Sequence, residues 1–151
     1  MEWIYDDGGR AEAGFKGITG DCCCRAIAIV TEMPYKEVYN LINQYGKAER
    51  MTKKVRARGR SNARTGVWKE TARKIMTDLG WTWHPTMKIG QGCKVHLETG
   101  ELPNGRLVCL VSHHYVAVID GVVHDTYDST RDGNRCVYGY FVRSKSINPC
   151  R

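Results

Sequence analysis

A cysteine, a histidine and an aspartate in this sequence have the types and the spacing that nucleophilic acyl transfer requires. Cys22 stands where a helix is expected to begin, and His114 and Asp125 lie in two consecutive apolar segments much later in the chain. In such chemistry a thiolate attacks a carbonyl carbon, an imidazole moves the proton, and a carboxylate holds the imidazole in the required tautomer. These three residues are therefore the candidate catalytic group.

The two segments that carry His114 and Asp125 are expected to form a β-hairpin. Both are rich in β-branched residues, and Asp120-Gly121 joins them. Asp-Gly in this position is the strongest short-range signal for a two-residue turn of type I′. The turn makes His114 and Asp125 diagonal neighbours on one face, about 7–8 Å apart and less between Cβ atoms. An aspartate at that position can reach and orient the imidazole.

Other histidines leave alternatives open. His113 and Asp128 form a competing pair on the opposite face, and a register slip of one residue would exchange the two pairs. His124 belongs to the same hairpin but lies off the favoured face. His84 and His96 have no recognisable partners, so we expect them on the surface or in loops.

Cys22 has a functional and a structural interpretation. The free N–H groups and the dipole at a helix N-terminus stabilise a thiolate and lower the thiol pKa, which favours a nucleophile. Alternatively, Cys22 is a small packing residue, because it begins an apolar helical stripe. That stripe continues through Ala26, Ile29 and Val30. Cys23 and Cys24 are expected to be packing residues.

Three helices are expected in the first half of the chain. The first begins at Asp21 or Cys22, with Asp21 as its N-cap, and runs to about Glu32 before Pro34. The second follows Pro34 and ends at Gly46, and its apolar stripe contains Val38, Leu41, Ile42 and Tyr45. The third spans about Gly66–Leu79 and carries a stripe of Trp68, Ala72, Ile75 and Leu79.

The second half reads as strands, after a first twenty residues that we expect to be irregular. The expected strands are Trp81–His84, Lys94–Leu97, Arg106–Ser112, His114–Ile119, Val122–Tyr127 and Val137–Arg143. Helices followed by an antiparallel sheet define an α+β order. The length of 151 residues suits a single domain spanning 1–151.

Composition and cysteine spacing indicate where the protein works and whether it binds a metal. No apolar run is long enough to span a bilayer and the acidic N-terminus lacks an apolar signal region, so we expect a cytoplasmic protein without a membrane role. In a reducing compartment the seven cysteines are expected to be thiols. Cys22, Cys23 and Cys24 are too closely spaced for a usual zinc site. The others, Cys93, Cys109, Cys136 and Cys150, are scattered singly. We expect neither a metal nor a cofactor.

Positive charge is concentrated in one segment, Lys47–Arg64. It holds eight basic residues and one acid, Glu49, and this excess of seven equals the net charge of the whole chain, +7. The segment lacks an apolar period and is expected to be a loop. Its cations could follow nucleic-acid phosphates, recruit an acidic protein, select acidic substrates beside the cleft, or form a solvated surface. The residues concerned are Lys53, Lys54, Arg56, Arg58 and Arg60.

At the candidate catalytic residues the sequence resembles papain-like cysteine peptidases, most closely the compact bacteriocin-processing type. In that type an Asp-Cys pair opens a helix, a histidine begins a hydrophobic strand, and an aspartate follows after a short hairpin. Gly20-Asp21-Cys22, His114–Val118 and Asp125 match this order and spacing. The resemblance implies a papain-like fold, with a helical half carrying Cys22 packed on an antiparallel sheet. It also implies peptide or isopeptide hydrolysis by a Cys22–His114–Asp125 triad.

A second resemblance covers more of the chain. The pattern around Gly20–Ile27, together with Ser112–Gly121, is similar to small uncharacterised proteins of phages and bacteria. It implies a phage-type effector, in the host cytoplasm if viral, or a module that binds nucleic acid or an acidic protein without turnover. Either alternative keeps the papain-like fold.

One position departs from the papain-like pattern. Those enzymes carry a glutamine a few residues before the cysteine that donates to the oxyanion, whereas residues 15–20 here contain neither Gln nor Asn. Thr19, or backbone N–H groups near Cys22, are the expected substitutes. Loss of one such donor typically costs about 10²–10³ in rate.

Overall fold

Residues 1–145 are described by the computed structural model, and their order of elements is α+β, as predicted. Helices occupy the first half, between a short first strand and five later strands. The elements are β1 (Trp3–Tyr5), α1 (Cys22–Thr31), α2 (Tyr35–Lys47), α3 (Lys53–Arg58), α4 (Lys69–Asp78), β2 (Trp81–Pro85), β3 (Arg106–Val111), β4 (His114–Ile119), β5 (Val122–Asp125) and β6 (Val137–Arg143).

The strands form one sheet in the order β1-β5-β4-β3-β6-β2. The β4–β5 hairpin has the predicted register, with Ile119 opposite Val122 and Val118 opposite Val123. Both turn residues have positive φ, 48° at Asp120 and 78° at Gly121, as a type I′ turn requires. The local chemistry of Asp-Gly therefore fixed this part of the sheet.

The sheet is mixed, so the expectation of a wholly antiparallel sheet is wrong at one edge. β1 pairs with β5 in parallel, with Tyr5 opposite Asp125. We expected the first twenty residues to be irregular, but Trp3–Tyr5 add a strand beside the end of the hairpin that carries Asp125. Three residues are too few to show a strand period in a glycine-rich segment.

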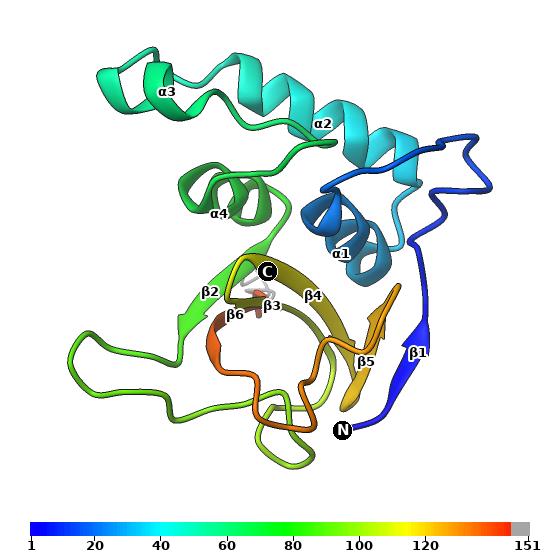
Figure 1. Ribbon diagram of the computed structural model, residues 1–151, viewed down its shortest axis with the longest axis vertical. Helices are drawn as coiled ribbons and strands as arrows, with labels where there is room; N and C mark the ends of the chain where they lie inside the picture. The colour runs from blue at the N-terminus through cyan, green and yellow to red at the C-terminus, as the bar shows by residue number, and fades with distance from the viewer. Residues whose placement is uncertain (146–151) are drawn as a thin grey trace, which may run out of the picture.

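Helices α1 and α4 cover one face of the sheet, and α2 packs on them as an outer layer (Figure 1). Each buries an apolar stripe, for example Val38 and Ile42 of α2 and Ala72 and Ile75 of α4. Tyr115 and Ala117 of β4 contribute to the same core. This packing fixes α1, and hence Cys22, against the strand that begins at His114.

The opposite face of the sheet is covered by long connections and not by helices (Figure 1). Alternate strand residues, including Leu107, Val116 and Val118, form a second apolar core there. Lys94–Leu97 was expected to be a strand, but it contributes only an isolated bridge between His96 and Cys136. Leu97 is nevertheless fully buried in this core, which explains the apolar signal in the sequence.

The basic segment departs from the predicted loop. Lys53–Arg58 form the short helix α3, capped by the Thr52 side chain, which accepts a hydrogen bond from the Val55 N–H at 3.1 Å. Helix α2 continues through Gly46 to Lys47, so Gly46 does not end it. Glycine is required there for another reason, because a Cβ would overlap the Ser61 carbonyl. No helix within residues 1–145 is both long and apolar enough to cross a membrane.

Candidate active site

Cys22 is the first residue of α1, as the sequence predicts. Asp21 precedes it at the N-cap position, as predicted, but its side chain makes no capping hydrogen bond. The carboxylate is fully buried and instead contacts Arg25 and accepts a 2.6 Å hydrogen bond from the Tyr35 hydroxyl. The N–H groups of the first turn thus donate no hydrogen bond to the Asp21 side chain, and they leave positive partial charge at the end of the helix where Cys22 lies.

His114 is the first residue of β4, directly after the tight turn at Ser112 and His113. Its imidazole is buried, and Nε2 lies 2.6 Å from Oδ2 of Asp125, the last residue of β5. The structure therefore brings together the pair that the hairpin register predicts. With Nε2 bonded to the carboxylate, Nδ1 is the ring nitrogen left for the Cys22 thiol.

Arg25 completes the site and was missed by the sequence analysis. One turn after Asp21 on α1, its guanidinium contacts the Asp21 carboxylate and also donates to Oδ1 of Asp125 at 3.2 Å. The Thr126 N–H donates to the same Oδ1 at 2.7 Å. Arg25 thereby ties the helix that carries the thiol to the strand that carries the carboxylate. The sequence did offer one signal of this role: Arg25 is a charged residue with only apolar neighbours on its helix.

Charge and burial act against each other at the Cys22 thiol. Burial raises its pKa, but a hydrogen bond and positive charge from His114 lower it, as do the Tyr115 N–H and the charge of Arg25. The net result is a pKa below that of an ordinary cysteine. Because the thiolate is the nucleophilic form of cysteine, the site favours the reactive species.

The pKa values of the His114 imidazole and the Asp125 carboxylate shift in opposite directions, and both shifts favour the charged forms. Burial lowers the pKa of His114, but its hydrogen bond to Asp125 and its contact with Cys22 outweigh burial and raise the pKa overall. Burial raises the pKa of Asp125, but the bond to His114 and the Thr126 N–H lower it overall. The three groups therefore favour a thiolate beside an imidazolium that an ionised carboxylate orients.

The other free thiols have different surroundings. Burial raises the pKa of Cys24 to about 12, and it also raises the pKa of Cys23 and of Cys109. Cys23 and Cys24 are core residues, as expected. Cys22 differs from its two neighbours because it is only half-buried and faces His114.

The competing pair does not form. His113 is exposed in the turn with φ of 54°, and the Asp128 carboxylate accepts hydrogen bonds from the N–H and the hydroxyl of Thr130. His124 pairs with Asp6, where Nδ1 and Oδ2 are 3.1 Å apart. The hairpin turn thus places His114, and not His113, against an aspartate.

Thr19 is a poor oxyanion donor in this arrangement. Its hydroxyl donates to the carbonyl of Arg64 at 3.0 Å, so its one proton is already used. The remaining expected donors are backbone N–H groups at the start of α1, beside Cys22. Of the two oxyanion donors expected from the sequence, the backbone N–H groups are the ones that the fold leaves free of Thr19's constraint.

Cys22 and His114 open onto a cleft of about 740 Å³ between the α3–α4 region and the ends of β3 and β4. Val67 and Trp68 contribute to one wall and Leu110 to another. A smaller hollow of about 380 Å³ adjoins it beside Trp83, and its lining includes the charged residues Lys69, Glu70 and Arg73. The paired residues are therefore reachable by an extended ligand.

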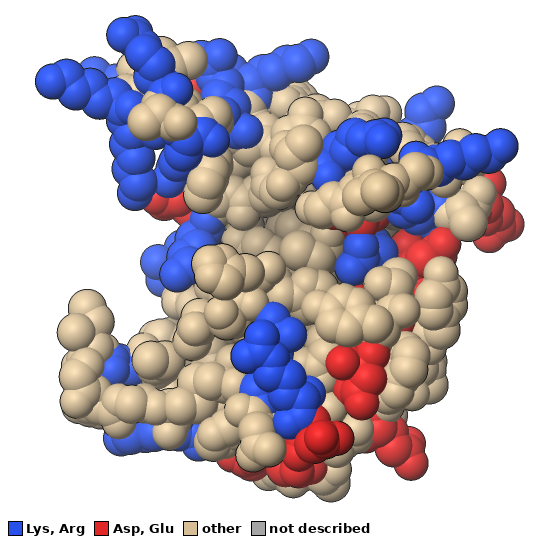
Figure 2. All heavy atoms as spheres, in the orientation of Figure 1, with Lys and Arg blue, Asp and Glu red and all other residues tan. Residues whose placement is uncertain are grey.

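The basic residues divide into two groups. Lys53, Lys54 and Arg56 are exposed on α3, whereas Arg58 and Arg60 line the cleft with Cys22. Figure 2 shows Lys and Arg side chains gathered over the α3 end of the molecule. The predicted basic surface exists, but only part of it faces the candidate site.

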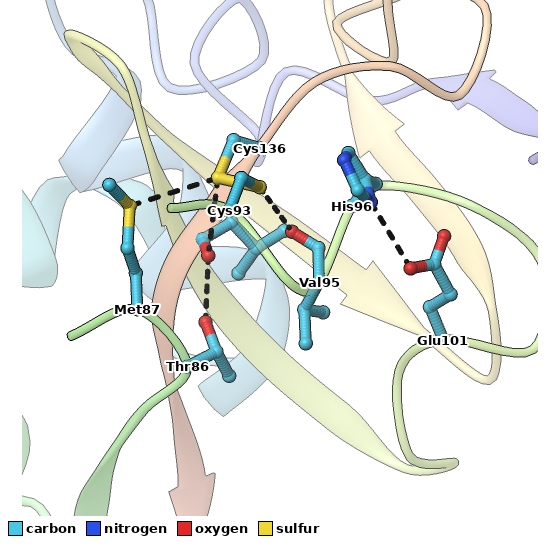
Figure 3. The surroundings of a disulfide bond; sticks show 8 residues. Thr86, Met87, Cys93, Val95, His96, Glu101 and Cys136 are labelled. Carbon is cyan, nitrogen blue, oxygen red and sulfur yellow. Dashed lines mark hydrogen bonds and ion pairs between the residues drawn. A yellow bond between two sulfur atoms is a disulfide. The ribbon is translucent and has the colours of Figure 1, made fainter. Parts of the chain in front are cut away.

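Cys93 and Cys136 form a disulfide, which corrects the expectation that all cysteines are thiols. The bond joins the connection after β2 to the residue before β6, and Met87 lies against it (Figure 3).

His96 was expected to have no partner, but its Nδ1 lies 3.2 Å from Glu101. His84 stacks on Tyr140. Cys150 lies outside the described residues.

Within residues 1–145, no group of three or more His, Cys, Asp or Glu side chains is placed to hold a metal ion. Comparison of the chain with models of protein families, with curated proteins and with solved structures finds no match. The functional interpretation therefore depends on the geometry and electrostatics of the site itself.

Proposed function

We propose that this protein is a cysteine hydrolase of papain-like architecture that cleaves peptide or isopeptide bonds. The observation that carries the proposal is that Cys22 and His114 line one cleft and that the His114 imidazole bonds to the Asp125 carboxylate at 2.6 Å, with the pKa of the Cys22 thiol lowered. A nucleophile, a base and an orienting group within mutual reach are what thiol-dependent acyl transfer needs.

In the proposed reaction, the Cys22 sulfur attacks the substrate carbonyl carbon to form a tetrahedral adduct. Backbone N–H groups at the start of α1 stabilise the oxyanion. His114 protonates the amine as the C–N bond breaks, which leaves a thioester on Cys22. His114 then takes a proton from water, whose oxygen attacks the thioester, and the product acid and the thiol are released. Asp125 keeps the imidazole oriented in both steps.

The test is a substrate-independent search for cleavage. Wild-type protein and Cys22→Ala would each be incubated with a mixture of unfolded proteins, and new peptide termini would be identified by mass spectrometry. New termini produced by the wild type and absent with Cys22→Ala support the proposal. Cys23→Ala is the matched control, because it removes the neighbouring thiol of the same helix and should retain cleavage.

A second candidate is a binding module that keeps the fold without turnover. The exposed cations of α3 and the commitment of the Thr19 hydroxyl to the Arg64 carbonyl favour it. It predicts that Cys22→Ala leaves binding of nucleic acid or an acidic protein unchanged, with no cleavage by the wild type.

A further inference from the structure

The cleft beside Cys22 is lined by cations on one side. Arg58, Arg60 and Lys69 line it together with Cys22 and His114. None of the described residues that line it is an aspartate or a glutamate. A ligand that reaches the thiol therefore meets positive charge and no carboxylate of the cleft wall.

The three cations differ in how far they are neutralised. The Arg58 guanidinium lies over the Trp68 ring at 4.2 Å and pairs with Glu70 at 3.6 Å. Arg60 donates from Nε to the Glu49 carbonyl at 3.3 Å, and Lys69 lies 5.8 Å from the Tyr138 ring. Among the described residues, neither Arg60 nor Lys69 pairs with a carboxylate, so both charges are available.

The fold holds this wall in place. Val55 of α3 is buried, and the Trp68 indole donates to the Gly59 carbonyl at 2.9 Å. The Glu49 carboxylate accepts a 2.8 Å hydrogen bond from the Ser61 N–H and a further bond from the Thr71 hydroxyl. The chain on both sides of Arg60 is thus attached to the segment that follows α2 and to the start of α4. Cations on an attached segment lose less freedom when they bind a ligand.

We propose that the cleft selects polypeptide substrates that carry an acidic residue near the cleaved bond, and that Arg60 and Lys69 bind its carboxylate with Arg58 behind them. This inference builds on the proposed function and names its substrate class. A carboxylate satisfies an arginine fork or an ammonium with charge-assisted hydrogen bonds. An acidic polypeptide fits better than a nucleic acid, because the acyl transfer proposed for Cys22 cleaves backbone or side-chain amide bonds of a polypeptide, whereas the nucleic-acid backbone is held by phosphodiester bonds.

The test measures binding with Cys22→Ala, which holds substrate without cleaving it. The probe is a fluorescein-labelled peptide containing several glutamates, and its match has glutamine in place of each glutamate. Fluorescence anisotropy should show tighter binding of the glutamate peptide, on the order of tenfold, which corresponds to about 1.4 kcal/mol, because each charge-assisted contact is lost when glutamate is replaced by glutamine. Adding Arg60→Ser and Lys69→Ser to Cys22→Ala should remove that preference.

The matched control adds Lys53→Ser and Arg56→Ser, which remove the same amount of charge from α3 outside the cleft. This variant should keep the preference for the glutamate peptide. Loss of the preference in the control, or no preference in Cys22→Ala itself, would overturn the inference. So would tighter binding of single-stranded DNA or RNA through Arg60 and Lys69.

Failure of the proposed function gives a different result. If Cys22→Ala prefers the glutamate peptide but wild-type protein cleaves no polypeptide, acid selection stands and hydrolysis does not. If the wild type cleaves both peptides at equal rates, hydrolysis stands and acid selection does not. The two measurements therefore separate the two claims.

Discussion

Cys22 and the Cys93–Cys136 disulfide place sulfur in two regions of opposite construction. Cys22 lies at a helix N-terminus beside an imidazole and a guanidinium, at the end of a cleft. Cys93 and Cys136 lie on the other side of the sheet, where connections replace helices, and their bond joins two of those connections (Figure 3). The Cys22 sulfur is surrounded by charged groups, whereas the sulfurs of Cys93 and Cys136 are bonded to each other.

The difference teaches that position decides what a cysteine does in this fold. Cys23, one residue after Cys22, is buried in the core and its pKa is raised. Where helices cover the sheet, apolar packing holds the chain and leaves a thiol free for chemistry. Where connections cover it, fewer elements pack and a disulfide restrains the chain. Four predictions test this contrast, in order of expected effect.

The largest effect is expected in the rate at which the Cys22 thiol is alkylated. In the native protein, brief iodoacetamide treatment at neutral pH should label Cys22 faster than Cys23, Cys24 or Cys109 by about tenfold or more, because a lowered pKa increases the thiolate fraction and burial protects the others. Peptide mapping measures the rates. Labelling led by any of the three buried thiols would remove the distinction. Cys22→Ala should abolish both the fast labelling and all cleavage.

The next effect separates His114 from its neighbour. His114→Ala should reduce cleavage by about 10²–10⁴, because the general base is lost. It should also move the midpoint of Cys22 labelling to higher pH, since the imidazole lowers the pKa of the thiol. His113→Ala is the matched control: His113 lines the cleft, but it is His114 that bonds to Asp125 and lowers the pKa of the thiol, so this variant should leave the labelling midpoint in place and reduce cleavage far less. The reverse result would assign the base to His113.

How much of this site the sequence predicts depends on the range of each interaction. The pairing of His114 with Asp125 follows from the local turn at Asp120-Gly121, and the start of α1 follows from the apolar period after Cys22. Both are short-range effects. The α+β order was predicted for the same reason.

The remaining features depend on contacts between distant segments. The role of Arg25 depends on β5 and α1 lying side by side, and the Asp21 side chain bonds to Tyr35, 14 residues further along the chain, and makes no capping hydrogen bond. The disulfide depends on the path of a long connection, which carries no period in the sequence. Gly46 resembles a residue that ends a helix, but glycine is needed at this position because a Cβ would overlap the Ser61 carbonyl.

A smaller effect concerns Asp125. Its carboxylate stabilises the imidazolium and helps raise the pKa of His114, so Asp125→Asn should lower that pKa. Activity that needs protonated His114 falls as pH rises through this pKa, and the fall should therefore begin at lower pH in the variant. The histidine ring signals in NMR spectra report the same shift without turnover. An unmoved His114 titration would show that the carboxylate does not support the imidazolium.

The smallest effect on the site is expected from the other sulfur pair. Replacing Cys93 and Cys136 together by Ser should leave the rate of Cys22 labelling within about twofold, because distant sites without shared partners act nearly independently. The free energy of unfolding should fall by up to about 4 kcal/mol, since the disulfide closes a loop of 43 positions in the unfolded chain. Denaturant unfolding and peptide mapping on the same variant measure the two quantities. A fall in Cys22 labelling that follows the loss of the disulfide, in protein that remains folded, would mean that the connections on the far face help to position the thiol. The contrast between the two regions would then be one of degree.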